Sequence, residues 1–150
     1  MRCSWSDAGD HEPVTTVVEV HPPDLGPLLD VLEPGGWVNL RPAIEPDDDP
    51  GDPSSGVFAL FSARGPAVPL CTWHPGERSI GIEHGTGPKV AKRLDLPPGW
   101  RVAQDHPRRG LVVVVPLGVP DAEALAWLVD AGTQLCPVPT TGTWVAEVHP

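Results

Sequence analysis

Hydrophobic residues recur along this chain in short runs that Pro and Gly interrupt, and most of these runs predict β-strands. The runs are rich in valine and other residues that favour the extended backbone of a strand. Eight such runs are expected as strands, at residues 14–20, 37–40, 57–62, 68–73, 79–83, 100–104, 111–115 and 143–148. Every position of 111–115 is apolar, so both faces of that strand are expected to be buried.

Helical patterns occur in three places. Four leucines have the i, i+3, i+4, i+7 spacing of one helix face: Leu25, Leu28, Leu29 and Leu32. Asp24 is expected to cap that helix, and the glycine pair after Pro34 to end it. A short helix is expected over 88–94, and a longer one over 121–131 that ends at Gly132.

The order of these elements predicts an α+β fold, with a largely antiparallel sheet and helices on one of its faces. Residues 79–148 follow the ferredoxin-like βαββαβ order. Residues 1–13 lack periodicity and are expected to be a flexible tail, which leaves 14–150 as a single compact domain. Because this order of elements hosts many unrelated functions, it assigns no activity.

An internal echo suggests that the domain consists of two pseudo-repeated halves, 14–77 and 78–148. In each half an acid and a histidine close a strand, a helix follows, and a Pro/Gly stop precedes a tryptophan. The two tryptophans are Trp37 and Trp100. Duplication of one unit would explain the echo. Chance is the alternative, because a chain with 21 prolines repeats such stops readily.

The chain of 150 residues carries a formal net charge of −10, and the charge is unevenly distributed. Residues 1–77 hold thirteen acids and three basic residues, whereas 78–150 hold seven of each. Six of the basic residues lie between 89 and 109. Such asymmetry bears on partners rather than on fold. The acidic excess argues against a nucleic-acid partner.

Two further features bear on the compartment. No run of 18 apolar residues occurs, and no apolar region follows Met1, so neither a membrane span nor a secretory signal is predicted. The three cysteines form no CxxC pair: Cys3, Cys71 and Cys136. Free, reduced thiols are therefore expected rather than a disulfide framework. These features favour a cytoplasmic protein without a membrane association.

Two copies of Glu-Val-His-Pro raise the hypothesis of a metal site. Each copy places a carboxylate and an imidazole on one face of a strand: Glu19 with His21, and Glu147 with His149. If the two strands are neighbours, the four side chains could hold zinc or a similar divalent ion. The alternative is that proline ends each strand and the polar pair has no ligand. No other cofactor is predicted.

A second candidate site lies at the turn from the strand 79–83 into the helix 88–94. Backbone N–H groups at a helix start attract anions, and nearby basic side chains add positive charge. The expected ligand-binding residues are His84, Thr86, Gly87, Lys89, Arg108 and Arg109. The alternative is a glycine turn in which Thr86 caps the helix.

Other chemistries have little support in the sequence. The acidic stretch 47–52 lacks the EF-hand spacing and is expected to be a solvated loop. Cys71 and His74 should point to opposite faces of a strand, and no GxSxG elbow occurs. Four tryptophans in or beside strands are expected in the core: Trp37, Trp73, Trp100 and Trp144.

The sequence therefore favours a small acidic cytosolic protein that acts by binding, as a non-catalytic protein-interaction or regulatory module. The expected partner is another protein or a second copy of the chain. One alternative is an enzyme or ligand-binding domain that uses the 84–89 turn on an anionic small molecule. A second alternative is the divalent-metal site of the Glu/His pairs.

Overall fold

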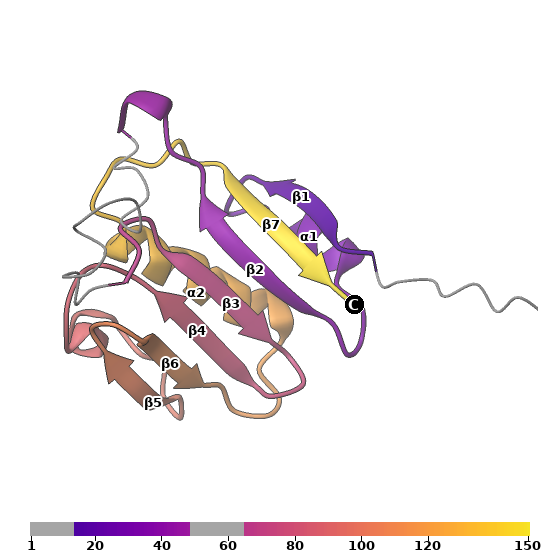
Figure 1. Ribbon diagram of the computed structural model, residues 1–150. Helices are drawn as coiled ribbons and strands as arrows, with labels where there is room; N and C mark the ends of the chain where they lie inside the picture. The colour runs from indigo at the N-terminus through magenta and orange to yellow at the C-terminus, as the bar shows by residue number, and fades with distance from the viewer. Residues whose placement is uncertain (1–13, 49–64) are drawn as a thin grey trace, which may run out of the picture.

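The computed structural model describes residues 14–48 and 65–150, whose strands form one antiparallel sheet (Figure 1). The strands follow the spatial order β1-β7-β2-β3-β4-β6-β5. Their bounds are Thr16–Val20 (β1), Trp37–Pro42 (β2), Leu70–His74 (β3), Ser79–Glu83 (β4), Arg101–His106 (β5), Gly110–Val114 (β6) and Trp144–His149 (β7). The helices are α1 (Gly26–Val31), α2 (Asp121–Leu135) and the 3₁₀ turns η1 (Pro46–Asp48) and η3 (Val90–Arg93).

Both α-helices lie on the same face of the sheet, as the sequence predicts (Figure 1). Helix α1 contacts β1 and β7, and α2 contacts β2, β3 and β4. Strand residues that point to this covered face are buried on alternate positions, for example Val38 and Leu40 in β2. The period-2 burial is that of a sheet with one face on the core and the other without a helical cover. The α+β class is therefore confirmed.

Three of the four tryptophans belong to the core. Trp73 and Trp144 are fully buried beneath α2, and Trp100 is buried beside the partly buried Trp127. Trp37 is the exception, because it lies on the opposite face of the sheet and is partly exposed. Its placement in the core was therefore wrong.

The prediction that both faces of 111–115 are buried was also wrong. Leu111, Val113 and Val115 are buried, whereas Val112 and Val114 are only partly buried. The physical reason is that α1 and α2 share one face, so none of the described helices lies above the apolar residues of β6 on the other face.

The ferredoxin-like order of 79–148 is not confirmed. Such a unit needs its last strand beside its first, but β7 lies between β1 and β2, and β2 and β3 separate it from β4. At each end of the sheet, two strands joined by a helical turn enclose a third: β7 lies between β1 and β2, and β6 between β4 and β5. Since β6 follows β5 directly and β7 comes from the far end of the described chain, the duplication is not confirmed either.

The predicted short helices differ in detail from the observed ones. Asp24 is not the N-cap of α1, which is Leu25; it lies one residue earlier, and its Oδ1 accepts the N–H of Gly26 at 3.0 Å. The helix expected over 88–94 is the single 3₁₀ turn η3. Lys89 precedes this turn with a left-handed backbone (φ 61°), which breaks the right-handed path that would start a helix at Pro88.

Helix α2 continues past Gly132, which the sequence pattern makes its end. A Cβ atom at this glycine would lie 2.7 Å from Cη2 of Trp144 and 2.8 Å from Sγ of Cys71. Gly132 is therefore a close-packing position at which the helix backbone approaches the covered face of the sheet.

Several predictions lie outside the described residues. These are the flexible tail at 1–13, the strand 57–62 and the acidic positions from 49 to 52. Among the described helices none has the length and hydropathy needed to cross a bilayer.

Candidate functional site

The face of the sheet opposite the helices, here called the open face, carries a mixed set of polar and aromatic side chains. In the β7–β2–β3 region it presents two partly exposed apolar residues, Leu70 and Val145, and six partly exposed polar or aromatic ones: Trp37, Asn39, Thr72, His74, Glu147 and His149. No helix within 14–48 or 65–150 lies above them (Figure 1). The strand alternation positions them, because each has a buried neighbour on the covered face.

Trp37 is the centre of this surface and is stacked between two histidines. Its ring centroid lies 4.0 Å from that of His149 on β7 and 4.9 Å from that of His74 on β3, with interplanar angles of 16° and 23°. The register explains the stack. Trp37 pairs with His149, and because Val38 pairs with Trp73 on an antiparallel strand, the next position along places Trp37 opposite His74. The result is a three-ring platform across three neighbouring strands.

Polar contacts join the side chains that lie next to the Trp37 platform on the open face. The hydroxyl of Thr72 donates to Oδ1 of Asn39 at 2.7 Å across β3 and β2. Arg41 and Glu147 form an exposed ion pair at 3.7 Å across β2 and β7. These contacts fix the side chains beside the aromatic platform, which limits the entropy that a bound partner would have to remove.

The sequence contained a signal for this surface that the core assignment of Trp37 missed. In β2 the order Trp37-Val38-Asn39-Leu40-Arg41 alternates strictly, so Trp37 shares its face with an amide and a guanidinium. His74 likewise shares a face with Thr72, and His149 with Glu147. Alternation therefore places Trp37 on the polar side, despite the tendency of tryptophan to be buried.

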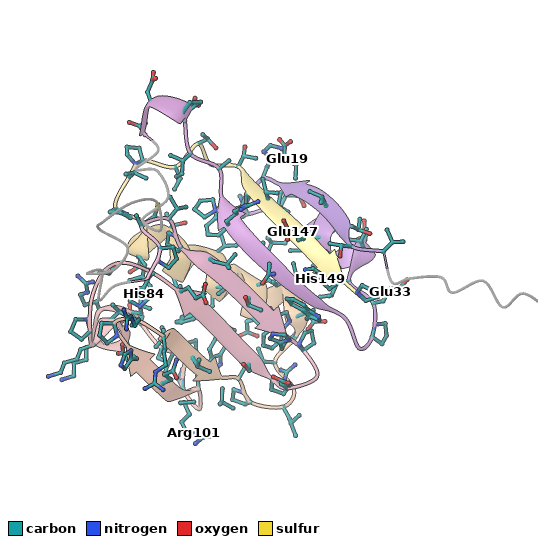
Figure 2. All side chains as sticks on the ribbon, in the orientation of Figure 1. Glu19, Glu33, His84, Arg101, Glu147 and His149 are labelled. Carbon is teal, nitrogen blue, oxygen red and sulfur yellow. The ribbon has the colours of Figure 1, made fainter. Side chains whose placement is uncertain are left out.

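Charges of opposite sign collect at the two ends of the sheet. Residues 14–48, which include β1, α1 and β2, contain seven acids and one basic residue, and β7 adds Glu147. The stretch 84–109, which forms η3 and β5, contains six basic residues and two acids. Glu19, Glu33 and Glu147 lie at the β1 end and Arg101 at the β5 end (Figure 2). We call these the acidic end and the basic end.

The two Glu/His pairs are not brought together into a metal site. Strands β1 and β7 are neighbours, as the hypothesis required, but they run antiparallel, with Glu19 opposite Val145 and Val17 opposite Glu147. Identical motifs on antiparallel strands place their histidines at opposite ends. His21 contacts Thr143 and His149 contacts Thr15, which separates the imidazoles by roughly 20 Å at ~3.4 Å per strand residue.

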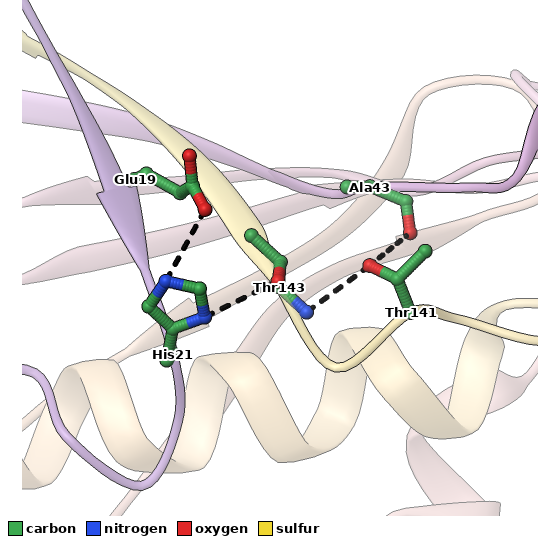
Figure 3. A network of polar contacts seen from close by, with 5 residues as sticks. All are labelled: Glu19, His21, Ala43, Thr141 and Thr143. Atoms are coloured by element: carbon green, nitrogen blue, oxygen red, sulfur yellow. Dashed lines mark hydrogen bonds and ion pairs between the residues drawn. The ribbon is translucent and has the colours of Figure 1, made fainter.

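His21 uses both ring nitrogens within the protein (Figure 3). Its Nε2 lies 3.2 Å from Oε1 of Glu19, and its Nδ1 lies 3.2 Å from the hydroxyl of Thr143. Thr141 extends the network, since its hydroxyl donates to the carbonyl of Ala43 at 3.1 Å. The Glu19–His21 pair therefore connects the end of β1 to the segment before β7. Within the described ranges no three His, Cys, Asp or Glu side chains form a group that could hold a metal ion.

The turn proposed as an anion site has its helical N–H groups already bound. The carboxylate of Asp105 on β5 accepts the N–H of Val90 at 3.3 Å and of Ala91 at 3.0 Å. Thr86 does not cap the turn, because its hydroxyl donates to the carbonyl of Leu135 at 3.2 Å. An anion at this helical start would compete with a carboxylate that the fold itself supplies.

His84 is the one fully buried polar side chain found in the described core. Its Nδ1 accepts the N–H of Thr86 at 3.2 Å, and its Nε2 has no hydrogen-bond partner among the described residues. Burial lowers the pKa of His84; Asp105 raises it and Arg93 lowers it further. The imidazole is therefore held in its neutral form, as a buried part of the core at the end of β4.

The remaining predicted ligand residues belong to the basic end. Lys89, Arg108 and Arg109 are exposed, and Gly87 is buried with a positive φ of 107°. His106 organises the β5–β6 turn, since its Nδ1 accepts the N–H groups of Arg108 and Arg109, each at 3.1 Å. No ligand-shaped arrangement follows from these contacts, and the anion site stays a prediction.

Cys71 is not a nucleophile in this environment. It lies on the covered face, whereas His74 is on the open face, as the strand alternation predicts. Burial raises the pKa of the Cys71 thiol, and the nearby Cys136 raises it further. The thiol is therefore protonated at neutral pH, and the thiolate is the reactive form.

The concavities among the described residues include two without a catalytic constellation. An apolar groove of about 360 Å³ separates α2 from residues 22–25, with Asp130 and Thr133 at its polar side. A smaller cavity of about 130 Å³ lies at the start of β1, beside Glu33 and His149.

Comparison with known proteins gives no match to this chain among protein-family models, curated proteins or solved structures.

Proposed function

We propose that this protein is a non-catalytic protein-interaction module that binds a partner protein on its open face. The observation that carries the proposal is the Trp37 platform, an aromatic side chain stacked between His74 and His149 on a sheet face without a described helical cover. The charge segregation along the same sheet supports a binding role, since opposed patches orient an approaching partner.

The energetics of interfaces favour this surface. Tryptophan is enriched among residues that dominate binding energy, in particular where its neighbours exclude water. Trp37 is held by two ring contacts, so little side-chain entropy would be lost on binding. Seven strands spaced by ~4.8 Å, each about five residues long, span a face of roughly 29 by 17 Å. The flat projection of this face, roughly 490 Å², is about 60% of the ~800 Å² that a standard interface buries on each partner.

The location of the protein belongs to the same proposal. Cys71 and Cys136 are free thiols in the fold, and free thiols suit a reducing compartment. We therefore place its action in the cytoplasm.

Photo-crosslinking from defined positions tests which face binds. A photoreactive amino acid replaces Thr72 on the open face in one variant and Glu123 on α2 in the other. After irradiation in an extract of the source cells, adducts should form from position 72 and be absent from position 123. Adducts from position 123 alone, or from neither position, would contradict the proposal.

Substitution of the aromatic centre provides the second arm. Trp37→Ala should abolish the adducts formed from position 72, because it removes the central ring of the platform. Leu117→Ala is the matched control, since Leu117 is a large apolar side chain that is 87% exposed in the turn between β6 and α2 and has no ring contact with Trp37. Adducts that persist in Trp37→Ala at the wild-type yield would also contradict the proposal. An adduct of twice the chain mass would identify a second copy as the occupant.

A further inference from the structure

The two edge strands of the sheet differ in how they are protected against pairing with another strand. On β5 the register shifts between Val102 and Gln104, Arg101 adds charge, and η3 packs beside the strand. Bulges, basic side chains and covering segments are the usual means by which proteins block edge-to-edge pairing. The β5 edge is therefore closed to an added strand.

Within the described residues the β1 edge has no bulge and no basic side chain, although α1 packs on the covered face of this strand. All five of its positions pair with β7 in continuous register, and the strand contains neither proline nor a basic residue. Val17 is 66% exposed, and Val14, just before the strand, is 79% exposed. A regular strand with exposed β-branched side chains offers the backbone groups and the contacts that strand addition requires.

A cavity lies directly at the start of this edge. It has a volume of about 130 Å³, and its lining is more polar than apolar: Thr16, Glu33 and His149 lie beside Val14, Val31, Val148 and Pro150. A long side chain with an aliphatic stem and a cationic head fits this combination, because the stem contacts valines while the head reaches a carboxylate. Lysine and arginine are the residues of that kind.

The surrounding charge selects the same type of partner. Seven acids lie in residues 14–48, and the single basic residue there, Arg41, is already within 3.7 Å of Glu147. An added strand that carries positive charge gains attraction at this end. A second copy that paired through its own β1 edge would instead bring one acidic end against another, at a cost in repulsion.

We propose that β1 takes up an extended basic segment of the partner protein as an eighth strand, with a lysine or arginine of that segment in the cavity beside Glu33. The inference rests on the proposed function, since it specifies how part of the same partner is bound. The sheet then continues from the open face into the partner, and the acidic end gives the contact its specificity.

Two synthetic peptides test the proposal on the intact protein. One is a nine-residue peptide that alternates valine or threonine with lysine, and the other has glutamate in place of lysine. In fluorescence anisotropy the lysine peptide should bind at least tenfold more tightly. Hydrogen exchange followed by NMR should show slower exchange at alternate amides of β1 on binding. Equal affinity for the two peptides, or unchanged exchange in β1, would overturn the inference.

Variants locate the contact. Glu33→Gln should weaken binding of the lysine peptide several-fold, whereas Glu83→Gln, an exposed carboxylate on β4, is the matched control and should leave it unchanged. Val17→Lys, at an exposed position that should tolerate the change, should weaken the lysine peptide and strengthen the glutamate peptide. Equal effects of Glu33→Gln and Glu83→Gln would overturn the inference.

The two proposals fail separately. If Trp37→Ala abolishes the adducts from position 72 while Val17→Lys leaves their yield unchanged, the strand inference is wrong and the open-face function stands. If the lysine peptide protects β1 while Trp37→Ala leaves the adducts unchanged, the open face is the wrong surface.

Discussion

Each face of the sheet carries a tryptophan, but the two tryptophans have different roles. On the covered face Trp73 is fully buried, and its Nε1 donates to Oδ1 of Asp121 at 3.0 Å beneath α2. On the open face Trp37 lies one strand away, stacked on two imidazoles and partly exposed. The difference teaches that residue type alone does not tell a stabilising tryptophan from a binding one. The residues two positions away on the same strand do distinguish them, because they share its face of the sheet.

The largest expected effect contrasts the two tryptophans. Trp73→Ala should lower the free energy of unfolding by about 3–5 kcal/mol, because it empties a fully buried site and leaves Asp121 without its donor. Trp37→Ala should lower it by about 1 kcal/mol or less, since the ring is partly exposed. Urea denaturation measures both. Equal losses would end the distinction between the faces.

Packing on the covered face gives the next effect. Gly132→Ala should cost about 1–3 kcal/mol, because the new methyl group overlaps Trp144 and Cys71 at 2.7 and 2.8 Å. Gly76→Ala is the matched control, since a Cβ there meets nothing within 4 Å. Thermal denaturation of both variants measures the cost. A Gly132→Ala protein as stable as the control would show that α2 does not pack as closely as described.

His84 makes the covered face sensitive to acid. Because burial lowers its pKa below the ordinary value of 6.5, the unfolded chain takes up a proton more readily than the folded protein. The stability linked to this group is complete above pH 6.5 and is lost as the pH falls below it. The melting temperature of His84→Gln should therefore fall less steeply between pH 7 and 5 than that of the wild type. Identical slopes would remove His84 as the cause.

The smallest expected effect is on the open face. Thr72→Val removes the hydrogen bond to Asn39, but Asn39 is only partly buried and water can replace the donor. The free energy of unfolding should fall by about 1 kcal/mol or less. Adduct formation from a photoreactive residue at position 147, which pairs with Asn39 across β7 and β2, should nevertheless decrease in this variant, because the Asn39 amide is no longer fixed. A stability loss as large as that of Gly132→Ala would contradict the comparison.

Local sequence predicted the elements well where alternation and turn residues agree. Six of the predicted strands correspond to β1, β2, β3, β4, β6 and β7 within a few residues, and the seventh, 100–104, corresponds to β5. The eighth, 57–62, lies outside the described residues. The single helical face also followed from the pattern, because alternate positions of most strands are apolar.

Long-range pairing could not be predicted in the same way. Nothing local to 144–149 specifies insertion between β1 and β2, and that pairing decides both the sheet order and the separation of His21 from His149. Asp105 likewise accepts the N–H of Val90 from 15 positions away in the sequence. The local sequence shows no partner for this N–H group, and the fold supplies one. Contacts of this kind follow from tertiary structure rather than from a motif.

The position of β7 has a consequence for biosynthesis. Trp37 of β2 pairs with His149 of β7, which is more than a hundred residues later in the chain. Strand β2 therefore cannot be joined to β1 through β7 until β7 has been synthesised. While the ribosome is still making the intervening residues, β1 and β2 are held apart by a missing strand. The nascent chain therefore exposes two unpaired strand edges until β7 emerges, and the acids concentrated in its first third help to keep that intermediate from aggregating.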